Sequence, residues 1–205
     1  MAYVLSWRRK KETYEEIDMF QTKGRLRWLR ENPGIRWRNM IVEPTNPINY
    51  LEIGVFKGET IIDMSKSYCK HPDSKMYCVD PWIDYEEYNE YKGKIETIHD
   101  IFVENMNKEN LWDRIKVYRD FSHNVVPSLQ DDFFDIAFID GNHETEFVYK
   151  DAIMVLPKIK SGGTIIFDDY DWKETKLGID TFLNEYSSQL KNVRYNTYQL
   201  FVDKL

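Results

Sequence analysis

From residue 49 onward, short apolar runs alternate with longer stretches whose apolar residues recur at helical spacing. The predicted strands are Tyr50–Ile53, Met76–Val79, Ile115–Tyr118, Phe134–Ile139 and Thr164–Phe167, and the predicted helices cover residues 58–70, 94–107, 122–130 and 144–159. Runs such as FDIAFI and GTIIF are continuously apolar, which is typical of buried parallel strands. The alternation therefore predicts an α/β fold in which helices cover both faces of a parallel sheet. A helix near 175–190 and an antiparallel hairpin of Val193–Tyr195 with Gln199–Val202 complete this pattern.

The first 47 residues have a different pattern. Apolar residues recur there at helical spacing, first at Tyr14, Ile17 and Phe20 and then at Leu26, Trp28 and Leu29. The segment Asn32-Pro33-Gly34 is a helix stop, and prolines at 44 and 47 mark a boundary. The sequence predicts an N-terminal helical extension or lid at residues 1–47, followed by a single domain at 48–205.

Composition excludes several classes of protein. The chain has 205 residues, with no apolar run near the roughly 20 residues of a membrane-spanning helix. Two cysteines cannot build a disulfide framework, so we expect a cytoplasmic protein without a signal peptide. The net charge of −7 combines +5 over residues 1–40 (10 basic minus 5 acidic) with −12 over the remainder (18 minus 30). Because the main body is acidic, we expect neither a nucleic-acid partner nor a membrane partner.

A glycine-containing turn follows the first predicted strand. It reads Glu52-Ile-Gly54-Val-Phe-Lys-Gly58, and Asp80 ends the next strand 22 residues beyond Gly58. Glycines at this place let a ligand approach the backbone, and an acid at this spacing can accept both hydroxyls of a ribose. Dinucleotide-binding proteins use G-x-G-x-x-G here instead, and the acids Glu52 and Glu59 disfavour a pyrophosphate. The turn therefore favours a nucleoside ligand that carries positive charge, with a dinucleotide as the alternative.

Three further acids end the fourth and fifth predicted strands: Asp140 in FIDGNHE, and Asp168 with Asp169 in IIFDDYDW. Carboxyl ends of neighbouring parallel strands meet at one edge of the sheet, so these acids converge. Converging carboxylates repel one another unless some are protonated or a cation lies between them, and oxygen ligands favour Mg²⁺ or Mn²⁺. Because successive strand residues face opposite sides, both Asp168 and Asp169 can bind one metal only if the strand has already ended there. The alternative is that Asp168 caps a turn.

The E-x-G-x-x-x-G turn, the acid in CVDPW and the C-terminal hairpin together resemble class I S-adenosylmethionine-dependent methyltransferases over residues 48–205. This resemblance implies a Rossmann-like, doubly wound sheet of seven strands in the order 3-2-1-4-5-7-6, with strand 7 antiparallel. It also implies a cofactor site in which Glu52 and Gly54 lie by the methionine moiety and Asp80 holds the ribose. Asp120 and Ser122 approach the adenine, and Trp82 covers its face. The implied cofactor residues are Glu52, Gly54, Gly58, Asp80, Trp82, Asp120, Ser122 and Asp140.

The pattern IDG-x-H…GG-x-I-x-x-DDY is similar, more specifically, to metal-dependent sugar O-methyltransferases of the macrocin and noviose type. By that resemblance Asp140, Asp168 and Asp169 hold Mg²⁺ or Mn²⁺. Some members carry an aspartate as general base where this chain has Asn142, and an amide cannot accept a proton. We therefore expect His143 to act as the base beside Asp140, with a helix-capping role for His143 as the alternative.

The expected acceptor is a sugar hydroxyl, such as that of a 6-deoxyhexose like rhamnose in a glycan or glycoside. The Tyr-rich, acidic stretch PWIDYEEYNEYKGK after the second strand offers aromatic faces and carboxylates that suit a carbohydrate. A catechol-like phenol and a dinucleotide-binding Rossmann protein are the alternative interpretations. A homo-oligomer and a place within a larger glycan-building enzyme are both compatible with the sequence.

Overall fold

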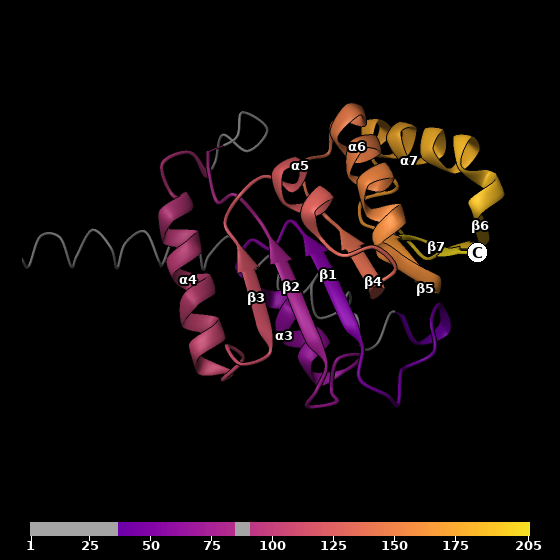
Figure 1. Ribbon diagram of the computed structural model, residues 1–205. Helices are drawn as coiled ribbons and strands as arrows, with labels where there is room; N and C mark the ends of the chain where they lie inside the picture. Colours follow the sequence, from indigo (N-terminus) through magenta and orange to yellow (C-terminus); the bar gives the residue numbers. More distant parts are fainter. Residues whose placement is uncertain (1–36, 85–90) are drawn as a thin grey trace, which may run out of the picture.

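The computed structural model describes residues 37–84 and 91–205, and Figure 1 shows the arrangement of their elements. The strands are β1 (Asn49–Ile53), β2 (Lys75–Val79), β3 (Ile115–Tyr118), β4 (Phe134–Ile139), β5 (Ile159–Phe167), β6 (Leu190–Tyr195) and β7 (Leu200–Lys204). The α-helices are α3 (Glu59–Lys66), α4 (Ile95–Lys108), α5 (Ser122–Val125), α6 (Thr145–Val155) and α7 (Lys173–Glu185). Short 3₁₀ turns cover Trp37–Asn39 (η1), Val126–Ser128 (η3), Leu156–Lys158 (η4) and Ser187–Gln189 (η5).

The seven strands form one sheet in the order β3-β2-β1-β4-β5-β7-β6. Neighbouring strands from β3 to β5 are parallel, whereas β7 runs antiparallel to both β5 and β6. This topology confirms the predicted fold class, including the single antiparallel strand. The order in which strands are added changes direction between β1 and β4, which is where a doubly wound sheet opens a crevice at the carboxyl ends of its strands.

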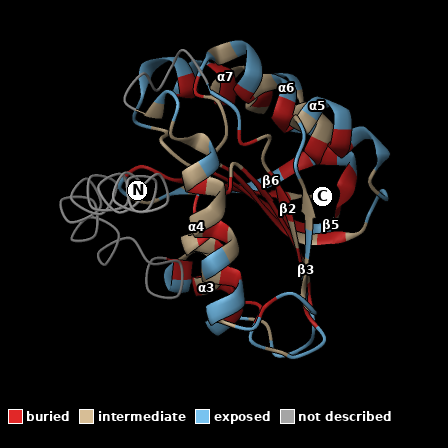
Figure 2. Ribbon diagram, turned by 90° about the vertical axis from the view of Figure 1, so that its left-hand side faces the viewer, coloured by how far each residue is buried: buried red, intermediate tan, exposed pale blue. Residues whose placement is uncertain are grey.

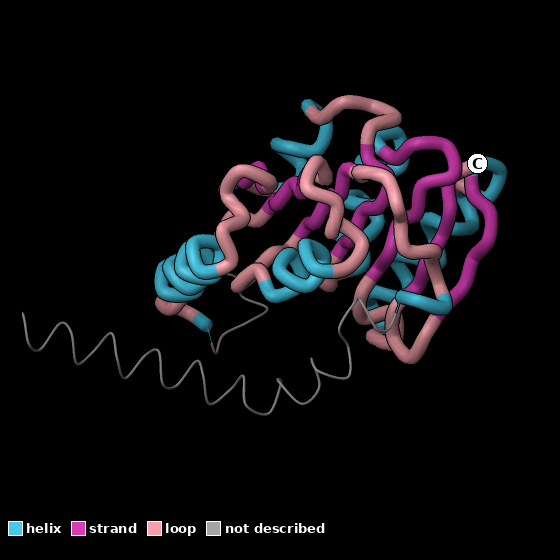
Figure 3. The backbone as a smooth tube through the Cα atoms, turned by 90° about the horizontal axis from the view of Figure 1, so that it is seen from below, coloured by secondary structure: helices cyan, strands magenta, loops and turns pink. Residues whose placement is uncertain are grey.

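Helices cover both faces of the sheet, as Figures 2 and 3 show. Side chains of α3 and α4 pack on one face in a core that includes Ile61, Met64 and Phe102. Side chains of α6 and α7 pack on the other face, with Val148 and Phe182 at the centre of the second core. Burial of both faces explains why the central strands are continuously apolar rather than alternating.

Trp37 belongs to the first of these cores. Its side chain is fully buried, and its ring packs on those of Tyr68, Phe138 and Phe201 at centroid distances of 5.6, 5.6 and 6.1 Å. Trp37 falls within the N-terminal extension predicted at residues 1–47, and its ring packs in the core of the domain. Residues 1–36 of that extension lie outside the described residues.

Element boundaries differ from the predicted ones where glycine or proline intervenes. The fifth strand begins at Ile159 rather than Thr164, because Gly162 (φ +80°) lets the strand pass through an irregularity in its pairing with β4. Helix α6 ends at Val155, and Pro157 lies in the 3₁₀ turn that follows. Residues 122–130, predicted as one helix, instead form the short α-helix α5 and then the 3₁₀ turn η3, which contains Pro127. Proline lacks the N–H that would continue either helix.

Among the described residues, no helix combines the length and the apolar character that crossing a bilayer requires.

Candidate active site

Three of the acids predicted at strand ends are held there by backbone hydrogen bonds that continue the sheet. The N–H of Asp80 donates to Tyr118 O (3.2 Å), and the N–H of Asp140 donates to Ile53 O (2.9 Å). The N–H of Asp168 donates to Ile139 O over 3.1 Å. The three acids line a cavity of about 720 Å³ at the carboxyl edge of the sheet, together with Glu52, Gly54, Ser122 and His143. A volume of this size accommodates a nucleoside-sized ligand.

Gly54 makes the close approach between the first turn and the β4 acid. Its φ is +82°, and a Cβ at this position would lie 1.8 Å from the carbonyl oxygen of Asp140. Only glycine fits this conformation and this contact. Gly58 (φ +77°) precedes α3, and a Cβ there would meet Met106 and Phe102 of α4 at 2.7 and 2.8 Å. The predicted glycines thus serve close packing around the cavity as well as the turn itself.

Asp80 closes the turn against β2. Its Oδ2 accepts hydrogen bonds from the N–H groups of Val55 and Phe56, both at 2.9 Å, and its Oδ1 accepts one from Trp82 N (2.7 Å). The buried Trp82 indole donates from Nε1 to Phe56 O (2.8 Å) and packs on His99 and Phe102. Asp80 and Trp82 therefore form one wall of the cavity and hold the glycine turn in shape.

The cavity concentrates buried carboxyl groups. Burial raises the pKa values of Glu52, Asp80, Asp140 and Asp168 above their ordinary range, and the pKa of Asp140 rises to about 6. Tyr50 Oη donates a hydrogen bond to Glu52 Oε2 (2.7 Å). Within the described part of the chain, none of the four carboxyls pairs with a lysine or an arginine. A cationic ligand would therefore be favoured here.

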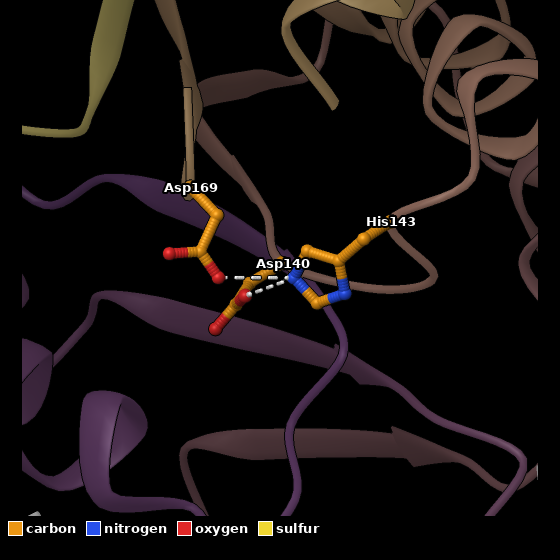
Figure 4. A group of neighbouring side chains, drawn as sticks. All are labelled: Asp140, His143 and Asp169. Carbon is orange, nitrogen blue, oxygen red and sulfur yellow. Dashed lines mark ion pairs between the residues drawn. The ribbon is translucent and has the colours of Figure 1, made fainter. Parts of the chain in front are cut away.

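Asp140, His143 and Asp169 point toward one another, as Figure 4 shows. Nε2 of His143 lies 3.1 Å from Asp169 Oδ2 and 3.8 Å from Asp140 Oδ1. One donor atom from each of the three lies within 4.8 Å of the others, which suits a divalent cation. The Trp172 ring packs on His143 at a centroid distance of 4.8 Å. Asn142 Oδ1 accepts a hydrogen bond from Glu144 N (2.8 Å), so Asn142 shapes the turn before α6.

The acidic pair of β5 divides between two environments. Asp168 lines the cavity beside Gln199; burial raises the pKa of its carboxyl, and the nearby Gln199 side chain lowers it in part. Its Oδ1 is buried and has no hydrogen-bond donor. Asp169 has left the strand (φ +47°) and turns toward His143. β5 ends at Phe167, so Asp168 and Asp169 both lie beyond the strand. Within a strand their side chains would face opposite sides of the sheet, and only beyond its end can both acids serve one site.

Of the residues predicted to approach an adenine, Ser122 lines the cavity and Asp120 does not. Asp120 is exposed; its Oδ1 accepts hydrogen bonds from Phe121 N (2.7 Å) and Asn124 Nδ2 (2.9 Å), which turn it away from the cavity and onto α5. Ser122 does line the cavity, and its Oγ donates to Asp151 Oδ1 (2.6 Å). Burial raises the pKa of Asp151 to about 6.

Sequence reasoning missed Asp151. The available signal was a carboxylate on the apolar face of α6, next to Val148, Ala152 and Val155. An acid on a buried helix face needs a partner or a ligand.

The middle of the Tyr-rich acidic stretch proposed for acceptor binding, residues 85–90, lies outside the described residues. At its ends, Asp84 and Tyr91 line the cavity, and the Tyr91 ring packs on Phe56 at 5.2 Å. Phe147, 41% exposed, also contributes an aromatic ring to the cavity lining.

Comparisons with known proteins agree with this geometry. Residues 51–170 match the model of a methyltransferase-domain family. The uncharacterized protein R132 of Acanthamoeba polyphaga mimivirus is 25% identical over 157 residues, which are 76% of this chain and 66% of R132. The chain thus spans just under two thirds of that relative.

Among solved structures, the O-methyltransferase NovP superposes with a TM-score of 0.62 at 16% identity, covering 88% of this chain and 79% of NovP. The Streptococcus mutans protein SMU.1697c, in complex with SAH, superposes with a TM-score of 0.57 at 14% identity, covering 78% of this chain and 90% of that protein. At these identities the likeness to solved structures concerns the fold.

The strand order is that of the solved methyltransferases, and the glycine turn and the acid-lined crevice lie at the carboxyl edge of this sheet. The family match covers more than half of the chain, so this protein belongs to the methyltransferase-domain family.

Proposed function

We propose that this methyltransferase binds S-adenosylmethionine in the acid-lined cavity and transfers its methyl group to a hydroxyl oxygen. Glu52, Gly54, Gly58 and Asp140 would surround the methionine end, where a cationic sulfonium and ammonium meet buried carboxyls. Asp80 would bind the ribose, with Trp82 and Ser122 on the adenine side. The charge of the cavity carries this proposal, and the SAH complex of the Streptococcus mutans protein supports it.

We propose further that Asp140, Asp168 and Asp169 hold Mg²⁺ or Mn²⁺, with His143 beside them. The donor set fits such a cation, since carboxylate oxygens of Asp140 and Asp169 converge and Asp168 Oδ1 is buried without a donor. When bound, the cation would lower the pKa of the acceptor hydroxyl and fix its position.

Side chains of this protein would then accept the hydroxyl proton and stabilise the charge that develops. The acceptor oxygen forms a bond to the methyl carbon as the carbon–sulfur bond breaks, leaving S-adenosylhomocysteine, and the hydroxyl proton passes to a base. His143 is proposed as that base because its Nε2 faces the cluster, whereas Asn142 is engaged in the turn. Asp140 and Asp169 contact the same nitrogen, so their carboxylates would stabilise the imidazolium that forms once Nε2 has taken the proton.

The proposed acceptor is a sugar hydroxyl, for example of a 6-deoxyhexose in a glycan or glycoside. Aromatic rings at the cavity, those of Tyr91 and Phe147, offer stacking faces for C–H surfaces. The likeness to the O-methyltransferase NovP supports transfer to oxygen. We propose no nucleic-acid or membrane partner, and a cytoplasmic location in keeping with the buried free thiols of Cys69 and Cys78.

The test is methyl transfer from S-adenosylmethionine to deoxysugar glycosides and to catechols, with and without chelator. We expect methylated sugar, no turnover in excess chelator, and recovery with Mg²⁺ or Mn²⁺. Asp140→Asn should lose Mn²⁺ binding, whereas Asp120→Asn, outside the cavity, should behave as wild type. Turnover of catechol alone would replace the sugar by a phenol, and full activity in chelator would make the acids structural. Stabilisation by a nicotinamide dinucleotide instead would favour a dinucleotide-binding protein.

The base is tested separately with His143→Ala. A general base contributes about 10²–10⁴-fold, so we expect turnover to fall by that factor while SAH affinity is unchanged. Mn²⁺ affinity distinguishes the two roles of the imidazole: a base leaves it nearly unchanged, and a metal ligand weakens it together with turnover. A loss of less than tenfold would remove His143 from proton transfer.

A further inference from the structure

A buried hydrogen bond joins the start of the described chain to its last hairpin. Trp37 Nε1 donates to Gln199 Oε1 over 2.9 Å, although 162 residues separate the two in sequence. Both side chains are buried, and the Trp37 ring is enclosed by Tyr68, Phe138 and Phe201. Both residues also lie outside the segment that matches the methyltransferase family, residues 51–170. Their contact is therefore a feature of this chain beyond the family's shared part.

This hydrogen bond fixes the orientation of the Gln199 amide. An indole N–H can only donate, so the atom facing Trp37 must be the amide oxygen. Asn196 Nδ2 also faces that oxygen, at 3.3 Å. The amide nitrogen of Gln199, a donor, must then point in another direction. A free amide would have no such preference between its oxygen and its nitrogen.

The sheet places Asp168 opposite Gln199. In the antiparallel pairing of β5 with β7, Phe167 is opposite Leu200 and Ile166 is opposite Phe201. One step further along this register brings Asp168 opposite Gln199, and directly opposed residues project to the same face. Both line the cavity, and the Gln199 amide lies close enough to the Asp168 carboxyl to lower its pKa as a hydrogen-bond donor does. The other carboxyl oxygen, Oδ1, is buried without a donor.

We propose that Gln199, locked by the indole N–H of Trp37, is a positioning residue that holds one oxygen of Asp168 and directs the other to a cation in the cavity. The inference rests on the proposed function, in which Asp168 is a ligand of the divalent cation. It makes the turn at residue 37 part of the active-site architecture. Partners that orient ligating carboxylates typically contribute about 10–100-fold to metal affinity.

The test measures Mn²⁺ affinity, SAH affinity and turnover in wild type and three variants. Gln199→Met keeps the length of the side chain but removes the donor, and we expect Mn²⁺ to bind about 10–100-fold more weakly. Trp37→Phe keeps an aromatic ring in the core but removes the N–H; we expect a loss of roughly three- to tenfold in Mn²⁺ affinity, within the lower part of that range. SAH affinity should stay within twofold in both, and kcat should fall more than the KM for the methyl donor rises.

Trp112→Phe is the matched control. Trp112 Nε1 also donates to a side-chain amide, Asn107 Oδ1 (2.7 Å), but Trp112 lies in the turn between α4 and β3, outside the cavity lining. Its Mn²⁺ affinity should equal that of wild type. If Gln199 transmits the effect of Trp37, adding Trp37→Phe to Gln199→Met should change Mn²⁺ affinity by less than twofold.

Two results would overturn the inference, and they differ from each other. If wild type binds Mn²⁺ and Asp140→Asn loses it, but Gln199→Met binds as wild type does, the proposed function stands and the positioning role is wrong. If wild type itself binds no Mn²⁺, the cation leaves the proposed function and the positioning role falls with it.

Discussion

At the scale of single residues, Gly54 couples the cofactor turn to the β4 acid most directly. A Gly54→Ala side chain would lie 1.8 Å from Asp140 O in a backbone with φ +82°. Gly162→Ala is a matched control, because Gly162 has φ +80° but open space around its Cβ. The control should lose about 1–2 kcal/mol from left-handed strain alone. Gly54→Ala should be destabilised further and lose SAH binding; equal melting temperatures and equal SAH affinity in the two variants would contradict this reading.

Asp151 gives a pH-dependent prediction. Burial raises its pKa from an ordinary 3.8 to about 6, so its ionised form disfavours the folded state, and stability falls as pH rises from about 4 to about 6. Asp151→Asn can still accept the Ser122 hydrogen bond without this penalty. Relative to wild type, the variant should gain on the order of 2 kcal/mol in unfolding free energy between pH 4.5 and pH 7.5.

Asp120→Asn is the control for this pH experiment. Hydrogen bonds from Asn124 and Phe121 hold the pKa of Asp120 below its ordinary value, so its contribution is lost only as pH falls below about 3.8. The effect of Asp120→Asn on urea unfolding should therefore be the same at pH 4.5 and pH 7.5. A constant difference between Asp151→Asn and wild type over that range would refute the assignment.

These two aspartates also show how far sequence reasoning reaches at this scale. Asp80, Asp140 and Asp168 could be placed at the cavity because a strand end fixes where the next side chain lies. Asp120 also follows a strand, but local donors turn it onto α5, and such competition between short-range hydrogen bonds is not visible in a motif. Asp151 was missed because it lies within helix α6 and not directly after a strand.

At the scale of elements, the last hairpin is fastened to β5 by a charged network. Asp203 of β7 accepts hydrogen bonds from Thr164 Oγ1 (2.7 Å), Arg194 (2.8 and 2.9 Å) and Asn192 Nδ2 (3.0 Å). These hydrogen bonds outweigh partial burial and lower the pKa of Asp203. Arg194 Nε also donates to Met40 O (2.6 Å), which ties the hairpin to the chain just after Trp37.

Asp203→Asn should therefore destabilise the protein. Charge-assisted hydrogen bonds are stronger than neutral ones, and we expect a loss of about 1–3 kcal/mol in unfolding free energy by chemical denaturation. Glu146→Gln, which removes an exposed helical pair with Lys150, should lose at most about 0.5 kcal/mol. Similar losses in the two variants would mean that the network contributes no more than a surface ion pair.

Sequence patterns predicted the elements better than their ends. All five parallel strands and the hairpin were expected from their apolar runs, and each is present. The ends moved where backbone conformation outweighed the apolar pattern. Gly162 allowed β5 to extend toward Ile159, and Pro157 ended the helical stretch that precedes it.

At the scale of the whole molecule, the ligand should stabilise the fold through the cavity. SAH at 100 times its Kd should add about 2.7 kcal/mol, or roughly 5–10 °C in Tm for a chain of this size. Asp80→Asn keeps an acceptor for the turn but loses charge, so its shift in Tm should be smaller. Asp113→Asn, in an exposed turn at the opposite end of the sheet, should shift as wild type does. An undiminished shift in Asp80→Asn would exclude Asp80 from ligand binding.

The overall topology could be predicted because the strand order follows from the family resemblance and from the alternation of elements. The partner that each side-chain oxygen of the site faces could not be predicted, because it depends on contacts between distant segments of the chain. The division of Asp168 and Asp169 between Gln199 and His143 is one such case, and the burial of Trp37 beneath the sheet is another.

The contact between Trp37 and Gln199 also sets an order of events on the ribosome. Synthesis at about 5–20 residues per second delivers Gln199 roughly 10 to 30 seconds after Trp37. Until then the indole has no acceptor, Phe201 is missing from its surroundings, and β5 lacks the neighbour that β7 supplies. A nascent chain held at this stage exposes an unpaired strand edge, the kind of surface at which chains associate. Slow translation of the last hairpin would therefore be expected to increase aggregation rather than merely delay the enzyme.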